Sequence, residues 1–296
     1  FWGGAVGQKI VTADLVRLRA ELQVIAEAGI PTVFLCDANF GILPQDLEVA
    51  CLLVEARATW GAPHTVHVNW AKNHAARVEQ ILDIFEAGGI RTHVYLALQT
   101  LDREALAIAG RDERGRAEML ALGRQIIQRG GTVGAELIYG LPGETLAHFR
   151  TAYDALFMAF PNLLLHPLWI LPNTGYDQNR DALGIVTIRP DPLVDYEGVL
   201  EHATLDRDDN RAGLRLLVAD EILLGTGWAT TTVRGLVRWG GLSASAVLDA
   251  FLTYLAASDT ALAVSLMAAV SRVDRECYFH RSERAHVRRA VFADRS

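Results

Sequence analysis

The sequence has little cysteine: its 296 residues contain only Cys36, Cys51 and Cys277. This excludes a disulfide-stapled secreted domain and favours a reducing, cytoplasmic compartment. No two cysteines stand at a C-x-x-C spacing, and His64 and His67 lead into a predicted strand without a third ligand. Nothing within the chain therefore predicts a closed zinc or iron–sulfur site.

Long apolar runs and an excess of positive charge are also missing. No apolar stretch reaches the roughly 20 residues that a membrane helix needs. The net charge is -7, which argues against a broad nucleic-acid surface. The locally basic residues 272–289 are typical of a solvated helix face. We therefore expect neither a membrane nor a nucleic acid as a partner.

Three familiar site motifs are missing as well. The sequence has no G-x-G-x-x-G after a predicted strand, no G-x-x-x-x-G-K-[ST] and no G-x-S-x-G. Their absence excludes a dinucleotide fingerprint, a P-loop and a hydrolase nucleophile elbow.

What the sequence does contain is a repeated pattern in "IAEAGIPTVFLCDANF", "IFEAGGIRTHVYLALQ" and "IIQRGGTVGAELIYG". In each, an amphipathic run ends at glycine and an apolar run follows, which predicts helix, glycine cap and strand. "PHTVHVNW" and "LLLHPLWILP" predict two more strands. A spacing of roughly 30 to 40 residues indicates βα units and a parallel sheet.

Residues that favour helix starts precede the predicted helices. Pro44 suits the first turn of the second helix, with Asp46 and Glu48 near its positive end. The other predicted caps are Thr12 or Asp14, Asn73 and Thr145. A βα protein normally begins with a strand, so we expect "FWGGAVGQK" to follow a strand that this chain lacks. The strand at residues 32–35 should then have an unpaired edge. From about residue 208 the pattern is helical.

Polar and aromatic residues stand where the predicted strands end, which is where open parallel sheets and barrels bind ligands. They are Asp37, Asn39, Phe40, Asn69, Trp70, Gln99, Thr100, Glu136, Tyr139, Gly140, His166 and Trp169. Such a ring suits a polar small molecule with an aromatic ring and hydroxyls, although some of these residues can equally cap loops and helices. A mid-strand carboxylate is costly to bury unless it is paired or bound. Glu136 is therefore the leading catalytic candidate, with a structural hydrogen-bonded carboxylate as the alternative.

Five motifs in order, "FWGGAVGQK", "DANFGILPQDLEVA", "ALQTLDREAL", "ELIYGLPGET" and "LPNT", resemble the radical SAM superfamily and most of all its cobalamin-binding branch. The resemblance covers about residues 1–184. It implies an α/β fold: a partial TIM-type (βα)6 barrel lacking its first strand over residues 1–184. A mostly helical region over residues 185–296 follows.

The resemblance also implies cofactors. Family members carry a C-x-x-x-C-x-x-C loop that holds a [4Fe–4S] cluster, whose open iron takes the amino and carboxylate groups of S-adenosylmethionine. Phe1 is expected directly after the last of these cysteines, so the cluster ligands would lie upstream and no metal ligand would lie in this chain. Cobalamin is expected to bind mainly to a domain that precedes Phe1.

Individual positions follow from the same resemblance. Residues 37–41 match the motif that meets the methionine amino group, Gln99 the position near the ribose, and residues 138–140 the motif near the adenine. The match is partial, because the usual G-x-I-x-G-x-x-E has Glu136 at its first glycine and Glu144 one place late. The implied cofactor-binding residues are Phe1, Trp2, Gly3, Gly4, Asp37, Asn39, Phe40, Gln99, Glu136, Ile138, Tyr139, Gly140, Leu171 and Pro172.

The function implied is methyl transfer to a small or peptide-derived substrate, supported by a reducing electron donor. Two alternatives stay open. One is a cobalamin-independent radical SAM enzyme, such as a porphyrin-type oxidase or a methylthiotransferase. The other is a non-catalytic ligand-binding barrel that never held a cluster.

Overall fold

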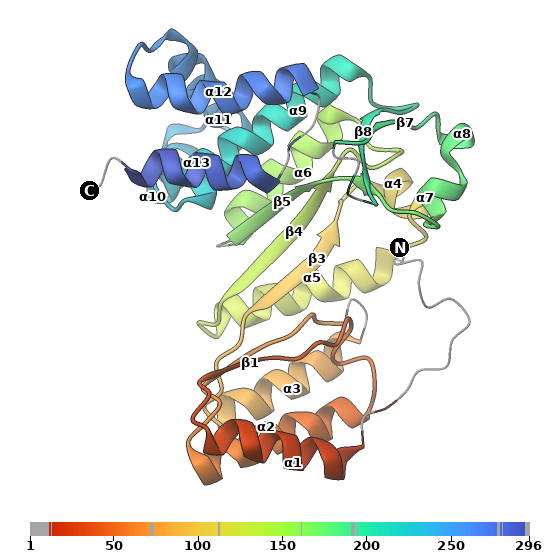
Figure 1. Cartoon of the computed structure of the whole chain (residues 1–296), viewed down its shortest axis with the longest axis vertical. Coiled ribbons are helices and arrows are strands. Elements are labelled where there is room, and N and C mark those ends of the chain that lie inside the picture. Colours follow the sequence, from red (N-terminus) through yellow and green to blue (C-terminus); the bar gives the residue numbers. More distant parts are fainter. Residues whose placement is uncertain are drawn as a thin grey trace. The chain divides into compact units, whose positions relative to one another are not determined.

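The computed structural model describes residues 12, 14–71, 74–111, 113–160, 162–190, 193, 195–276, 279 and 281–293. It is an α/β protein whose helices alternate with short strands before a helical C-terminal region (Figure 1). The chain divides into two compact units. Residues 14–98 and 113–135 form the N-terminal unit, and residues 99–111 and 136–293 form the C-terminal unit. Strands β3 and β4 belong in part to each.

The N-terminal unit is built from βα repeats. Its elements are α1 (Leu15–Glu27), β1 (Thr32–Phe34), α2 (Gln45–Trp60), β2 (Thr65–His67), α3 (Ala75–Ala87), most of β3 (Val94–Gln99), α5 (Glu113–Gln128) and the start of β4 (Val133–Tyr139). Strands β1 and β2 pair in parallel, with Thr32 opposite Thr65. Helices α1, α2 and α3 pack side by side (Figure 1). The repeated pattern thus predicted these elements and the direction of this pairing.

Strand β1 has a single partner, β2, among the described residues. Its second edge is therefore unpaired there, as the sequence predicted for residues 32–35. The described strands form one sheet of two strands and two sheets of three. A partial barrel stays a prediction.

Helix starts follow the predicted caps where the structure describes them. Asp14 caps α1 by accepting a hydrogen bond from the Val16 amide at 2.9 Å. Pro44 is the N-cap of α2, one residue before the first turn in which the sequence predicted it. Asp46 does more than favour the helix dipole: it is buried, and its Oδ2 accepts from the amides of Gly41 at 2.7 Å and Leu43 at 2.9 Å. The predicted cap Asn73 lies outside the described residues.

The C-terminal unit follows the ends of β3 and β4. Its elements are α4 (Arg103–Ile108), α6 (Leu146–Ala159), β5 (Asn162–Pro167), β6 (Trp169–Ile170), α7 (Gly175–Gln178), α8 (Arg180–Leu183), β7 (Val186–Ile188), β8 (Glu197–Glu201), α9 (Arg207–Asp220), η1 (Glu221–Gly225), α10 (Thr230–Gly240), α11 (Ala244–Ala257), α12 (Ala261–Glu276) and α13 (Arg281–Ala293). The sheet orders are β3-β4-β5 and β6-β8-β7, and the second is antiparallel. Thr145 caps α6 through the His148 amide at 3.2 Å, as predicted. The helical run that begins at Arg207 confirms the pattern expected from about residue 208.

The core of the C-terminal unit is tightly packed around Tyr139. This side chain is 2% exposed, and its ring lies edge-on to that of Phe149 at 4.8 Å. Its hydroxyl donates to the carbonyl of Asp209 at 2.8 Å. A Cβ built on Gly213 would lie 2.0 Å from Tyr139 Cζ, so only glycine lets α9 approach this closely. Helix α9 is therefore fixed against β4 by both packing and a hydrogen bond.

None of the described helices, taken singly, is both long and apolar enough to cross a membrane. Helices α11 and α12 reach that length and composition only as a pair, and they are bent by 117° at the break between them.

Candidate functional site

A cavity of about 360 Å³ lies in the C-terminal unit. This volume is at the lower end of the range of small-molecule sites, which is roughly 300–1,000 Å³. Among its lining residues are Gln99, Ile138 and Leu171, which come from three separate predicted motifs. His166 and Trp169, also predicted at strand ends, line the same cavity. The structure therefore brings together Gln99, His166 and Trp169, which the sequence placed at strand ends, and Ile138 and Leu171, which the resemblance implied as cofactor-binding residues.

Gln99 ends β3 in an unusual conformation. Its φ is 66°, a left-handed value that few residues other than glycine adopt. In the part of the chain that the structure describes, its side-chain amide has no hydrogen-bond partner. A strained residue with a free amide at a cavity wall is typical of a ligand contact.

Arg111 adds a cationic group to the cavity wall. Burial lowers the pKa of its guanidinium, and the nearby Tyr176 acts in the opposite direction. No carboxylate pairs with Arg111 in the described ranges. Arginine stays protonated even when it is perturbed, so an unpaired guanidinium here favours an anionic ligand group.

Tyr176 lies beside Arg111 in the cavity lining. Its hydroxyl is buried and has no hydrogen-bond partner in the structure. Burial raises the pKa of Tyr176 to about 12, so the phenol is neutral. Buried polar groups are normally hydrogen-bonded, which makes this hydroxyl a second group available to a ligand.

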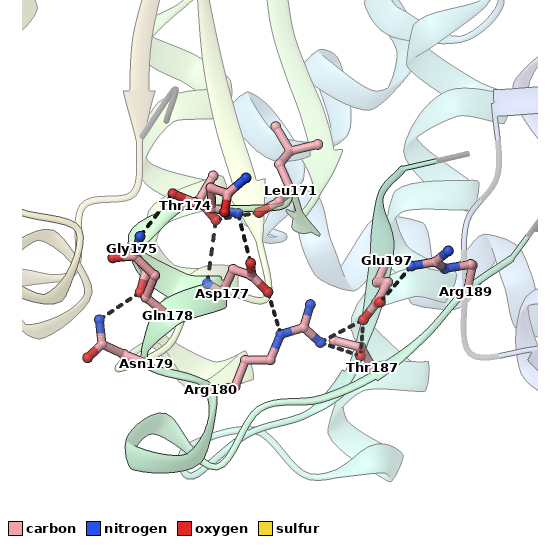
Figure 2. Close-up of polar contacts among 11 residues, drawn as sticks. Leu171, Thr174, Gly175, Asp177, Gln178, Asn179, Arg180, Thr187, Arg189 and Glu197 are labelled. Carbon is pink, nitrogen blue, oxygen red and sulfur yellow. Dashed lines mark hydrogen bonds and ion pairs between the residues drawn. The ribbon is translucent and has the colours of Figure 1, made fainter. Parts of the chain in front are cut away.

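The "LPNT" segment, residues 171–174, forms a fixed turn at the edge of the cavity (Figure 2). Thr174 Oγ1 donates to the carbonyl of Leu171 at 2.7 Å. The Asn173 amide, at φ 63°, donates to Asp177 Oδ2 at 2.8 Å. That hydrogen bond is the main cause of the lowered pKa of Asp177. The turn holds Leu171 against the cavity while Pro172 is exposed and outside the lining.

Arg180 ties this turn to strands β7 and β8 (Figure 2). Its guanidinium donates to Asp177 Oδ1 at 2.8 Å and to Glu197 Oε2 at 2.6 Å. The Thr187 hydroxyl donates to the same Glu197 oxygen at 2.5 Å. Hydrogen bonds from Thr187 and Arg180 lower the pKa of Glu197 to about 2. The network is therefore fully charged at neutral pH and fixes the loop from both sides.

Aromatic groups form another wall of the cavity. Burial, helped by the positive charge of Arg284, lowers the pKa of His166 to about 4, so its imidazole is neutral. The ring of Trp169 stacks on that of Tyr196 with centroids 4.7 Å apart. Because apolar Ile138 and Leu171 and polar Gln99 and Arg111 line the same cavity, it suits a molecule with both a ring and an anionic group.

The predicted residues of the N-terminal unit are held locally at the ends of β1 and β2. Asp37 Oδ1 accepts from the Asn39 amide at 2.8 Å, and Asn69 Nδ2 donates to the Asp37 carbonyl at 3.3 Å. Phe40 is buried, with its ring centroid 6.0 Å from that of Trp70. A cofactor role for Asp37, Asn39 and Phe40 stays a prediction.

Three predicted residues of β4 and its following turn lie outside the cavity lining. Glu136 is half-buried on β4. Tyr139 is engaged in the core through its ring and hydroxyl. Gly140 has a φ of 86°, which lets the chain turn after the strand. Their roles stay predictions, and Phe1, Trp2, Gly3 and Gly4 lie outside the described residues.

Metal ligands are not gathered anywhere in the described ranges, where no group of three or more His, Cys, Asp or Glu side chains could hold an ion. Cys36 and Cys51 are free and exposed, with Cys36 in the segment after β1 and Cys51 on α2. An iron–sulfur cluster needs several thiolates at one point. These residues therefore do not fit a cluster, and Cys277 lies outside the described residues.

Sequence reasoning missed Arg111 and Tyr176, and it named Glu144 without giving it a role. Arg111 opens a charged run that is typical of solvent-exposed chain. Glu144 is buried, and its Oε1 accepts a hydrogen bond from Thr100 Oγ1 at 2.6 Å. Arg111 and Tyr176 line the cavity and Glu144 is buried, and both facts depend on contacts between segments that are distant in the sequence.

No family model matches the chain. Among solved structures, it is similar to the radical S-adenosylmethionine methyltransferase TsrM from Kitasatospora setae, described with cobalamin and a [4Fe-4S] cluster bound. Identity is 19%, coverage is 62% of this chain and 35% of that one, and the TM-score is 0.48. It is also similar to Elp3 from Methanocaldococcus infernus, at 13% identity, 56% and 44% coverage and a TM-score of 0.41. At TM-scores under 0.5 these likenesses are too loose to establish a shared fold.

Two curated proteins match the sequence more closely. The cobalamin-dependent radical SAM methyltransferase TokK of Streptomyces tokunonensis is 32% identical over 222 residues, which are 70% of this chain and 33% of that protein. The 2-(S-pantetheinyl)-carbapenam-3-carboxylate methyltransferase of Streptantibioticus cattleyicolor is 34% identical over 185 residues, 62% of this chain and 27% of that protein. The chain thus spans about a third of the length of these relatives. The resemblance read from the motifs is confirmed: the chain is homologous to cobalamin-dependent radical SAM methyltransferases.

Proposed function

We propose that this chain is the S-adenosylmethionine-binding part of a cobalamin-dependent radical SAM methyltransferase. We also propose that the cavity of the C-terminal unit binds both the nucleoside and the carboxylate of that cofactor. One observation carries the proposal: Gln99, Ile138 and Leu171 come from three different motifs and line a single cavity. Residues that only capped helices or filled the core would not need to line the same cavity.

The chemistry of the lining fits S-adenosylmethionine. Ile138 and Leu171 offer apolar surface to the adenine ring, and the Gln99 amide offers hydrogen bonds to ribose hydroxyls. The unpaired guanidinium of Arg111 suits the carboxylate of the methionine part, since arginine–carboxylate bonds are charge-assisted. The ribose hydroxyls and the carboxylate of the ligand would then each meet a side chain that has no other partner among the described residues.

The bound S-adenosylmethionine, cluster and cobalamin supply the radical and methyl-transfer chemistry. The residues of this chain bind and orient. The fixed "LPNT" turn positions Leu171, and neutral His166 and the stacked Trp169 cover the aromatic side. We propose a small-molecule or peptide-derived substrate, supported by the pantetheinyl carbapenam in the name of one relative, and a reducing electron donor.

Calorimetric titration of the protein with S-adenosylmethionine tests the proposal. Gln99→Ala and Arg111→Ala should each weaken binding by about 1–3 kcal/mol, because each removes a hydrogen bond to a ribose or charged group. Asp37→Ala is predicted to act in the same direction. Arg124→Ala, a change of the same kind at an exposed residue on α5, should leave binding unchanged. Unchanged affinity in both Gln99→Ala and Arg111→Ala would contradict the assignment of the cavity.

Activity assays separate the remaining alternatives. Methyl transfer should require added cobalamin, and turnover that persists without it would favour the cobalamin-independent class. A non-catalytic barrel would bind the cofactor without cleaving it.

A further inference from the structure

The strained Gln99 is followed at once by a side chain that fixes the turn. Thr100 Oγ1 accepts from the Asp102 amide at 2.9 Å and donates to Glu144 Oε1 at 2.6 Å. A left-handed conformation outside glycine persists only where its surroundings over-determine it. The Thr100–Glu144 hydrogen bond is therefore part of what holds the φ of Gln99 at 66°.

Glu144 is itself rigidly supported. It is 2% exposed, and its amide donates to the Leu141 carbonyl at 3.0 Å. Thr204 Oγ1 accepts from the Gly143 amide at 3.1 Å and donates to the Glu144 carbonyl at 3.2 Å. The loop after β4 is thus fixed to the turn before α9, and it carries a carboxyl group to Thr100.

No cation pairs with Glu144 among the described residues, and its Oε2 is buried without a hydrogen-bond partner. Burial, opposed by the Thr100 hydrogen bond and helped by Asp102, raises the pKa of Glu144 to about 8. Its carboxyl group is therefore neutral at pH 7.

His202 and Tyr176, the two neighbours of Glu144 with strongly shifted pKa values, do not change charge near pH 8. Asp102 caps α4 and contacts His148 Nδ1 at 2.6 Å. Burial lowers the pKa of His202 to about 4. Burial raises the pKa of Tyr176, whose neighbour Arg111 stays protonated, to about 12. A change between pH 7 and 9 at this point is thus expected from Glu144.

We propose that Glu144 is a positioning residue for Gln99: through its hydrogen bond with Thr100 it holds the turn of residues 99–102 in the form that binds the ligand of the cavity. An ionised carboxylate with an unpartnered buried oxygen is costly, so the turn opens to hydrate it. Opening moves Thr100 and with it the amide of Gln99. The identity of the ligand, S-adenosylmethionine, rests on the proposed function; the positioning does not.

Calorimetry with S-adenosylmethionine at about pH 6.5 and about pH 9 tests this. If only the neutral form binds, the affinity of the unaltered protein falls by about tenfold, one factor of ten per pH unit above the pKa. Glu144→Gln keeps an acceptor for Thr100 and cannot ionise, so it should lack this extra loss. The amino group of the ligand titrates in both proteins, so only the difference between them reports on Glu144. Glu144→Ala should bind weakly at both pH values.

Glu104→Gln, the same change at an exposed position on α4, is the matched control and should keep the pH dependence of the unaltered protein. An identical pH dependence in Glu144→Gln and the unaltered protein would overturn the proposal. So would tight binding by a folded Glu144→Ala.

Hydrogen exchange without ligand separates this inference from the proposed function. The Asp102 amide, which donates to Thr100, should exchange faster in the unaltered protein than in Glu144→Gln at about pH 9, and equally at about pH 6.5. That result, together with no binding of S-adenosylmethionine, would reject the proposed function and leave the positioning role standing. Equal exchange at both pH values would reject the positioning role itself.

Discussion

Strand β1 of the N-terminal unit and strand β4, where it enters the C-terminal unit, arise from the same pattern of glycine followed by an apolar run. Their surroundings differ. Phe34 on β1 is 56% exposed, whereas Tyr139 on β4 is 2% exposed. Helix α1 similarly leaves Val16 80% exposed, while α9 buries most of its length against its neighbours. The sequence pattern therefore predicts where a strand forms, and the elements packed against that strand determine whether its apolar side chains are buried.

The deeper burial in the C-terminal unit also shifts the pKa values of its side chains. In the C-terminal unit, burial raises the pKa of Asp220 to about 7 and that of Tyr176 to about 12. Deep burial there raises the pKa of Glu144 to about 8 and lowers that of His166 to about 4. Perturbed titratable groups gather at functional sites more often than elsewhere. The unit with the deeper core is thus also the one that holds the candidate site.

The largest expected effect comes from filling the contact between α9 and β4. Gly213→Ala places a Cβ 2.0 Å from Tyr139 Cζ, so the ring or the helix must move. We expect the free energy of unfolding in urea to fall by about 3 kcal/mol or more. Gly175→Ala, where nothing lies within 4 Å of the new Cβ, is the matched control and should change it by less than about 0.5 kcal/mol. Equal effects of the two changes would mean that the core is less tightly packed than described.

The next effect concerns a buried polar pair. Tyr153 donates from its hydroxyl to Asp220 Oδ1 at 2.7 Å, and burial raises the pKa of Asp220 to about 7. Tyr153→Phe leaves that carboxyl oxygen without its donor and should cost about 1–3 kcal/mol in urea unfolding. Tyr254→Phe, at a 69% exposed position, should be close to neutral. A neutral Tyr153→Phe would show that water replaces the missing donor.

Stability should also depend on pH in a defined direction. Glu144 and Asp220 have folded pKa values of about 8 and 7, above their usual 4.5 and 3.8. The folded state therefore binds more protons than the unfolded state. The stability that these two carboxyl groups contribute is fully present below their usual pKa values and is lost as pH rises toward their folded pKa values.

His166 and His202 act in the opposite sense, because burial lowers both pKa values from 6.5 to about 4. The stability that these two histidines contribute is lost as pH falls from about 6.5 to 4, and it is constant above about pH 6.5. In the part of the chain that the structure describes, Glu144 and Asp220 lose their contribution above about pH 6.5, so the urea midpoint should fall from there to about pH 8. Glu144→Gln should reduce the fall, and a midpoint that rises over this window would contradict the assignment.

The smallest effect should be at the exposed strand of the N-terminal unit. Phe34→Ser removes a side chain that is already 56% exposed, so its cost in urea unfolding should stay below about 0.5 kcal/mol. A cost above about 1 kcal/mol would show that Phe34 is covered in solution and would weaken the contrast between the units.

What the sequence predicted was mainly local. The Asp14 and Thr145 caps bond to amides two and three residues away, so their patterns are readable along the chain. Gln99 was found because it belongs to a recognisable motif. Glu144 was named without a role, because that role depends on Thr100, 44 residues earlier, and the motif around it is displaced by one place. The cofactor role of Tyr139 stays a prediction, and the hydrogen bond of its hydroxyl to Asp209, 70 residues later, is one that no local pattern shows.

A crystal structure of the protein with S-adenosylmethionine bound tests the central claim most directly. The cofactor should lie in the cavity of the C-terminal unit, with Gln99 at its ribose, Arg111 at its carboxylate and Ile138 against its adenine. A cofactor bound without contact to Gln99 or Arg111 would contradict it.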